Sequence, residues 1–159
     1  MVTSLAEMIG RFHQPGRVEW IGVRPARRTA VESVSDVLVD EAGLTGDHAR
    51  RGKRAVTLLQ AEHLPAIARY LGKSAIKPED LRRNLVISGI NLSSLKHRDI
   101  QIGTARLFVE GICAPCSRME ETFGPGGYAA IRGHGGWYAR VVSGGRIALH
   151  DRVLPVQDV

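Results

Sequence analysis

The sequence predicts a mainly β protein with a few short helices, folded as a β-barrel or as a strongly bent sheet. The chain contains about six short apolar runs rich in β-branched residues, and glycines separate many of them. Only two stretches show the spacing of an amphipathic helix. With 159 residues, the chain suits one domain, 1–159, with a hydrophobic core of its own.

The first half of the chain opens with strand-like patterns. Residues 17–24 alternate apolar and polar side chains and predict a strand that ends at Pro25. Residues 31–39 contain four valines and predict a second strand with a bulge. The glycines and the aspartate of residues 43–48 predict a shaped turn. Residues 55–59 form an apolar run that predicts a buried strand.

Helical patterns follow in the middle of the chain. Residues 60–71 carry apolar side chains at helical spacing, and Gly72 supplies a stop signal. Residues 77–81 predict a single helical turn, because a proline is tolerated at the first helical position. Residues 85–88 predict another strand, which ends at Gly89.

The last part of the chain predicts two hairpins. Residues 100–102 and 105–112 are apolar runs that turn at the Gly-Thr pair between them. Residues 137–142 and 146–156 predict a closing hairpin around the Gly-Gly pair between them, because such a pair suits a tight primed turn.

Composition excludes several classes of protein. Apolar residues make up 43% and charged residues 24%, as in an ordinary globular protein. No stretch approaches the roughly 20 apolar residues that span a bilayer, so no membrane segment is expected. The first residues, 1–12, include Glu7 and Arg11 and lack the apolar region of a secretory signal. We therefore expect a cytoplasmic protein.

The chain is basic, with a net charge of +6 from 22 Lys and Arg against 16 Asp and Glu. Part of this excess is clustered at residues 50–54 and at Arg82 and Arg83. A basic surface favours an anionic partner, such as nucleic acid, a phosphorylated cofactor or an acidic substrate. A solvated charged face is the plain alternative.

The two cysteines, Cys113 and Cys116, are separated by two residues where a predicted strand runs into a loop. They are too close to staple a fold, and in a reducing compartment we expect thiols. They could form a dithiol redox pair, although the context of a thioredoxin-like motif is missing. They could also be half of a zinc site, but the spacing of the available histidines fits no finger pattern. These histidines are His48, His134 and His150.

A third interpretation is a single reactive thiolate at Cys116, next to the rigid Pro115. The nearby Arg118 and the general positive charge favour the thiolate over the thiol. Two buried structural thiols remain the alternative.

Polar residues in two other segments could bind a ligand. Arg82, Arg83 and Asn84 stand just before a predicted strand. Arginine grips phosphate or carboxylate through paired hydrogen bonds, and asparagine both donates and accepts. A salt-bridged surface is the alternative. Asp47 and His48 could position a ligand, but an aspartate after glycine is also a common turn-former.

The order of these motifs resembles the MOSC domain, which is named for the carboxy-terminal part of molybdenum cofactor sulfurases. The similarity extends from about residue 17 to about residue 156, which we take as the domain core. The order and spacing of the motifs carry it, rather than any one of them. The motifs are Gly43–His48, Val56–Leu59, Arg82–Ile90, Ile102–Ala105 with Leu107, Pro115–Cys116, Gly135–Gly136, Gly144–Gly145 and Asp151.

The resemblance implies a β-barrel-like MOSC fold and a cysteine that ligates molybdenum or carries sulfur. On this sequence that residue is Cys116, and Arg82 and Asn84 anchor the pterin and its phosphate. We also expect Arg54, His48 and Asp47 at the cofactor. Family descriptions also mention pyridoxal phosphate, through a partner desulfurase. No lysine here stands in a setting that suggests a Schiff base, so we expect no direct pyridoxal phosphate site.

The resemblance therefore predicts a stand-alone MOSC protein that binds molybdenum cofactor or carries sulfur on Cys116. It would act in the reduction of N-hydroxylated compounds, or in sulfur transfer from a pyridoxal-phosphate desulfurase. Its partner would be a cysteine desulfurase or a redox protein. The sequence leaves the oligomeric state open. The alternative is a non-enzymatic basic module that binds nucleic acid or another anion. Aromatic residues make up only 5%, too few for a stacking platform, so nucleic acid is not expected.

Overall fold

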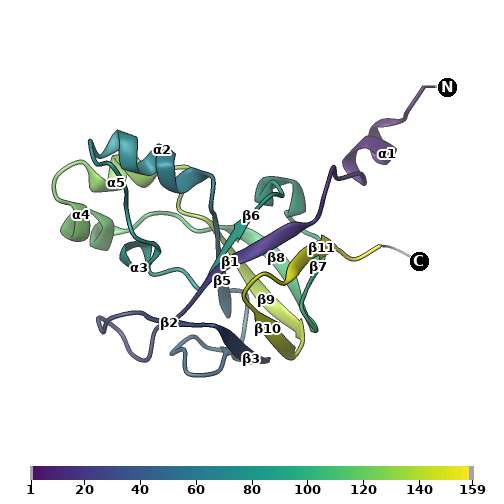
Figure 1. Ribbon diagram of the computed structural model, residues 1–159, viewed down its shortest axis with the longest axis horizontal. Coiled ribbons are helices and arrows are strands. Elements are labelled where there is room, and N and C mark those ends of the chain that lie inside the picture. Colours follow the sequence, from purple (N-terminus) through teal and green to yellow (C-terminus); the bar gives the residue numbers. More distant parts are fainter. Residues whose placement is uncertain (1, 158–159) are drawn as a thin grey trace.

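A closed β-barrel forms the body of the protein in the computed structural model, which describes residues 2–157 (Figure 1). Seven strands follow one another around it in the order β11, β7, β8, β9, β5, β6 and β1. The ring closes because β11 pairs with β7 on one side and with β1 on the other. The strands are β1 (Gly16–Val23), β5 (Val56–Gln60), β6 (Leu85–Ser88), β7 (Asp99–Ile102), β8 (Ala105–Ile112), β9 (Trp137–Ser143) and β11 (Arg152–Pro155).

Two smaller features extend the barrel. Strand β2 (Glu32–Val34) pairs with β1 outside the closed ring. A separate three-stranded sheet contains β10 (Gly145–Ala148), β3 (Asp36–Asp40) and β4 (Gly43–Leu44). All pairings are antiparallel except that of β5 with β6.

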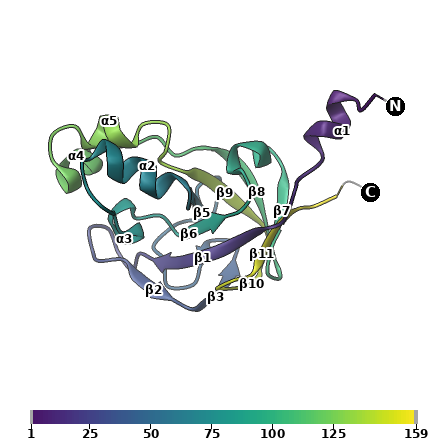
Figure 2. The same ribbon diagram turned by 45° about the horizontal axis from the view of Figure 1, so that its top comes forward.

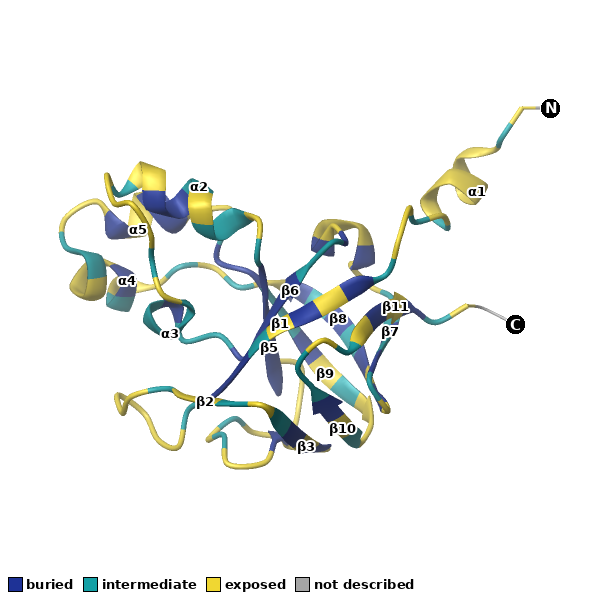
Figure 3. Cartoon of the chain, viewed as in Figure 1, coloured by how far each residue is buried: buried dark blue, intermediate teal, exposed yellow. Residues whose placement is uncertain are grey.

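The barrel wall separates two hydrophobic clusters. Alternate residues of β5 point to opposite faces, so Leu58 belongs to the cluster that fills the barrel and Leu59 to a second cluster outside it. The outer cluster packs β5 and β6 against the helices, through Ile67 and Met119 among others. Strand β5 is therefore buried at every residue, as Figure 3 shows.

Most of the helices gather at one end of the barrel (Figure 2). They are α2 (His63–Tyr70), α3 (Pro78–Leu81), α4 (Ser117–Phe123) and α5 (Gly127–Ile131). Helix α1 (Leu5–Ile9) buries none of its residues and projects from the opposite end, near the carboxy-terminal segment. A 3-10 turn, η1 (Leu92–Leu95), links β6 to β7. No helix in the described part of the chain is long and apolar enough to cross a bilayer.

Several predicted elements are confirmed. The patterns at 17–24, 55–59 and 85–88 are strands β1, β5 and β6, and the hairpin of 100–102 with 105–112 is β7 with β8. The helical stretches at 60–71 and 77–81 correspond to α2 and α3.

The single bulged strand expected at 31–39 is wrong. The segment breaks at Ser35 into β2, which pairs with β1, and β3, which pairs with β10 and β4. The two halves belong to different sheets, although Val34, Val37 and Val39 all pack against the cluster that fills the barrel.

The expected closing hairpin around Gly144-Gly145 is also wrong. Strand β9 pairs with β8 and β5, and β10 pairs with β3. The two glycines allow close approach between layers instead of a tight turn. A Cβ at Gly144 would lie 2.5 Å from the carbonyl oxygen of Val39, and one at Gly145 would lie 2.5 Å from the carbonyl carbon of Thr104. Helices α1, α4 and α5 were not predicted. Glycines punctuate the segment that holds α4 and α5 and hide their helical spacing.

Candidate functional site

The cysteine loop connects β8 to α4, and both of its ends are fixed by backbone hydrogen bonds. Cys113 directly follows β8, and its N–H donates to the carbonyl oxygen of Gly136 at 2.8 Å. Cys116 directly precedes α4, and its carbonyl accepts from the N–H of Met119 at 2.9 Å. The expected strand running into a loop is therefore confirmed.

The two thiols occupy different environments. Cys116 is exposed, whereas Cys113 is partly buried. Burial raises the pKa of the Cys113 thiol, and the positive charges of Arg83, Arg54 and Arg24 offset this only in part. Cys113 therefore keeps its proton at neutral pH. Cys116 is the thiol that a partner protein or a large ligand can reach.

Asp47 is the polar centre beneath the loops at this end of the barrel. Its side chain is completely buried, and Arg24 donates to it from its backbone N–H at 2.7 Å and from its guanidinium at 2.9 and 3.0 Å. The N–H of Ala49 donates to the same carboxylate at 3.1 Å. Burial alone raises the pKa of Asp47, but these hydrogen bonds and the charge of Arg24 outweigh it, so the pKa lies below its ordinary value.

Asn84 is buried beside Asp47, and each polar atom of its side chain has a protein partner. Its Oδ1 accepts from the backbone N–H of Thr57 at 3.0 Å and from the hydroxyl of Thr57 at 3.1 Å. Its Nδ2 donates to the carbonyl of Gly22 at 3.0 Å and to Asp47 at 3.2 Å. Asn84 thus ties β1, β5 and β6 together at the end that faces the site.

Arg82 lies between these buried groups and the surface. Its backbone is left-handed, with φ 55°, and its guanidinium donates to the carbonyl oxygens of Thr29 and Ala26. Burial and the charges of Arg118 and Arg24 lower the pKa of Arg82. Arg118 and Arg24 are thus near enough to Arg82 for their charges to act on it.

The other residues expected at the cofactor also lie near this network. The ring of His48 is hydrogen-bonded through Nδ1 to the carbonyl of Arg24, 2.9 Å away. The guanidinium of Arg54 stacks over Tyr138, with 4.9 Å from its central carbon to the ring centroid. The charge of Asp47 is balanced by Arg24. Within residues 2–157, no ion pair involves the remaining arginines around the loop, which are Arg54, Arg82, Arg83 and Arg118.

The geometry gives no support to a zinc site. Across the part of the chain that the structure describes, no three His, Cys, Asp or Glu side chains come together as metal ligands. Of the histidines considered, His134 packs against His63 and Tyr70, and the ring of His150 bonds to Arg17.

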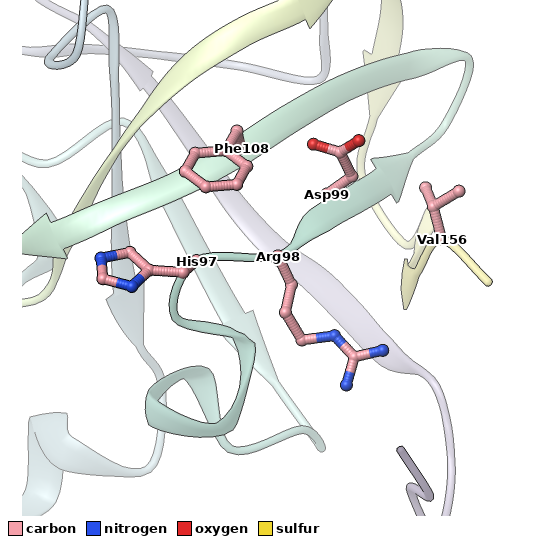
Figure 4. Close-up of a pocket in the computed structure, with 5 residues that line it drawn as sticks. All are labelled: His97, Arg98, Asp99, Phe108 and Val156. Carbon is pink, nitrogen blue, oxygen red and sulfur yellow. The ribbon is translucent and has the colours of Figure 1, made fainter. Parts of the chain in front are cut away.

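Arg24 was not predicted as a site residue. It binds the carboxylate of Asp47 and also donates to the carbonyl of Arg82 at 3.3 Å. Its position held a usable signal: Arg24 directly follows β1, whose carboxyl end lies beside the amino end of the antiparallel β6. A pocket elsewhere, lined by His97, Arg98, Asp99, Phe108 and Val156, lies against β7 and β8 and contains none of the predicted site residues (Figure 4).

The family model of the MOSC domain matches residues 42–154. Among solved structures, the chain is similar to the YuaD protein from Bacillus subtilis, with a TM-score of 0.76 and 20% identity over 88% of this chain and 94% of that one. It is also similar to YiiM from Escherichia coli, with a TM-score of 0.70 and 20% identity over 90% of this chain and 71% of that one. YiiM from Geobacillus stearothermophilus gives a TM-score of 0.72 at 20% identity, over 90% and 76%. A search of curated proteins by sequence gave no match.

Proposed function

Because the chain belongs to the MOSC domain family, we propose that it binds the molybdenum cofactor, with the thiolate of Cys116 as a ligand to the metal. The observation that carries this proposal is the position of Cys116. It is an exposed thiol at the end of the barrel where, among the residues that the structure describes, no ion pair involves Arg54, Arg82, Arg83 or Arg118.

The residues around the loop suit such a group. Thiolate is a soft ligand that matches a sulfur-rich molybdenum centre, and guanidinium matches phosphate. When bound, the molybdenum supplies the oxidation and reduction chemistry. The chain would supply one sulfur ligand from Cys116 and positive charge from Arg82 and Arg54.

The buried network beneath would keep these groups in place. The guanidinium of Arg24 donates hydrogen bonds to the carboxylate of Asp47 and to the backbone carbonyl of Arg82. Asn84 fixes the strand ends from which the arginines emerge. In this proposal Asp47 and Asn84 position the site, while the arginines and Cys116 contact the cofactor.

Sulfur transfer is the second candidate, and the exposure of Cys116 favours it. A carrier thiol must meet the persulfide of a partner protein, such as a pyridoxal-phosphate-dependent cysteine desulfurase. The Cys116 thiolate would attack the outer sulfur of that persulfide, form a new S–S bond and release the thiolate of the partner. In the cytoplasm, where we place this protein, Cys116 stays reduced between cycles.

The test compares wild-type protein, Cys116→Ser and Cys113→Ser, each purified from a molybdenum-replete host. We expect molybdenum and pterin in the wild type and in Cys113→Ser, and their loss in Cys116→Ser. Normal loading of Cys116→Ser would overturn cofactor binding through that thiol.

The sulfur-transfer candidate has its own measurement, which is intact mass after incubation with a cysteine desulfurase and cysteine. It predicts the gain of one sulfur atom on the wild type and on Cys113→Ser. An unchanged mass in both proteins would overturn it.

A further inference from the structure

The second cysteine of the loop, Cys113, lies against a glycine of the segment that leads into β9. A Cβ at Gly135 would lie 2.6 Å from the carbonyl oxygen of Cys113, closer than two such atoms can approach. The N–H of Cys113 donates to the neighbouring Gly136 at 2.8 Å. The loop around Cys113 is thus held tightly at a position where no side chain fits.

Arg83 reaches the same point from the start of β6. Its Nε donates to the carbonyl of Gly135 at 2.7 Å, and its Nη1 donates to the carbonyl of Leu81 at 3.2 Å. The same Cβ position at Gly135 would lie 3.6 Å from Nη2. Two backbone carbonyls therefore fix the guanidinium of Arg83, with Nη2 on the side of Gly135.

The charge of Arg83 is not balanced by an acidic side chain. Within the described residues Arg83 forms no ion pair, and Nη2 donates no hydrogen bond to the protein. Arg83 is also the charge that acts most strongly on Cys113. Because burial raises the pKa of Cys113, the thiol stays neutral and leaves the positive charge beside it available to a ligand.

Arg82 is arranged differently, although it adjoins Arg83 in the chain. Its guanidinium bonds to the carbonyls of Thr29 and Ala26 and so fastens the loop between β1 and β2. Arg83 is half-buried and anchored to Gly135, which lies against the backbone of Cys113. Of the two, Arg83 is better fixed to hold an anion next to the cysteine loop.

We propose that Arg83, Gly135 and Cys113 form an oxyanion subsite for a phosphate-type group, on the inner side of the cysteine loop. The Nη2 of Arg83 would donate to the oxyanion, and the neutral thiol of Cys113 would lie beside it without repelling it. The subsite rests on the proposed function only for its purpose, which is to hold the anionic part of the ligand that Cys116 meets.

The experiment uses Cys116→Ser protein, in which Cys113 is the only cysteine, and measures its rate of alkylation by iodoacetamide. Orthophosphate is titrated at constant ionic strength, with potassium chloride as the balancing salt. We expect phosphate to protect Cys113, and Arg83→Gln in the same background to weaken that protection by about tenfold or more. Arg132→Gln, which removes an exposed charge three residues from Gly135, should change it by less than about twofold.

Several outcomes would overturn the subsite. They are alkylation of Cys113 that phosphate does not slow, protection that survives Arg83→Gln, and protection lost equally in Arg132→Gln. Protection abolished by Arg82→Gln but not by Arg83→Gln would also overturn it. The first outcome needs no variant at Arg83, so it holds even where that substitution impairs folding. Because no cofactor or persulfide is present, the subsite and the proposed function can fail independently.

Discussion

The carboxylate of Asp47 and the guanidinium of Arg24 are joined through both carboxylate oxygens, at 2.9 and 3.0 Å. The aspartate side chain is 0% exposed and the arginine side chain 13%. Asn84 donates to the same carboxylate at 3.2 Å, so one buried acid links the end of β1 to the start of β6. Arg24 also donates to the backbone carbonyl of Arg82, so the pair supports the segment that carries Arg82.

Replacement of Asp47 by asparagine should lower the free energy of unfolding by about 3 kcal/mol, because it leaves the largely buried Arg24 without a counter-charge. Urea denaturation measures this. Glu41→Gln is the control, since Glu41 pairs with Arg51 on the exposed surface and should cost less than about 1 kcal/mol. Equal losses in the two variants would contradict the structural role of Asp47.

Stability should also depend on pH through Asp47. Its pKa is lower in the folded protein than the ordinary value of 3.8, so the folded state binds fewer protons than the unfolded chain in acid. The stabilisation is complete above the ordinary pKa and is lost as the pH falls through the lower folded value. Denaturation of the wild type below about pH 4 should show this loss, and Asp47→Asn should lack that component. An identical acid dependence in both proteins would count against it.

Replacement of Asn84 by alanine should lower the free energy of unfolding by about 2–3 kcal/mol, measured by urea denaturation. The substitution removes the acceptor of two Thr57 hydrogen bonds and the donor to Gly22, all of them buried. A loss below about 1 kcal/mol would show that water replaces the amide and that β1, β5 and β6 do not depend on it.

Replacement of Gly135 by alanine should destabilise the protein by about 1–3 kcal/mol, because the new Cβ would meet the carbonyl oxygen of Cys113. Gly10→Ala is the matched control, since a Cβ there would have its nearest contact at an ordinary 3.6 Å. Thermal unfolding of the two variants compares the effects. If Gly135→Ala were as stable as Gly10→Ala, the backbone at Cys113 would be able to move away from the new Cβ at little cost, which would contradict the prediction.

The barrel strands could be predicted because a short alternation of apolar and polar residues is enough to indicate a strand. In β8, Ala105, Leu107 and Val109 alternate with more exposed neighbours, and the fold buries them as that pattern predicts. Which strands pair with one another could not be predicted in this way, because the partners lie far apart in the sequence. The glycine pair at 144–145 has the composition of a hairpin turn, but β11 closes the barrel against β1 and β10 joins the small sheet.

The site was predictable in part. The position of Cys116 in the loop that follows a strand and the arginine-rich segment before β6 could be found from motifs. The contrast between the two thiols could not, because the burial of Cys113 depends on the packing of Gly135 and Gly136 from a distant segment. Arg24 was missed because its role comes from Asp47, 23 residues along the chain.

X-ray absorption at the molybdenum K-edge tests the central claim most directly, on protein reconstituted with the cofactor. If Cys116 ligates the metal, the wild type and Cys113→Ser should show one more sulfur neighbour at molybdenum than the cofactor free in solution does, and Cys116→Ser should retain no molybdenum. The same number of sulfur neighbours in the bound and the free cofactor would contradict the claim, as would a wild-type protein that retains no molybdenum.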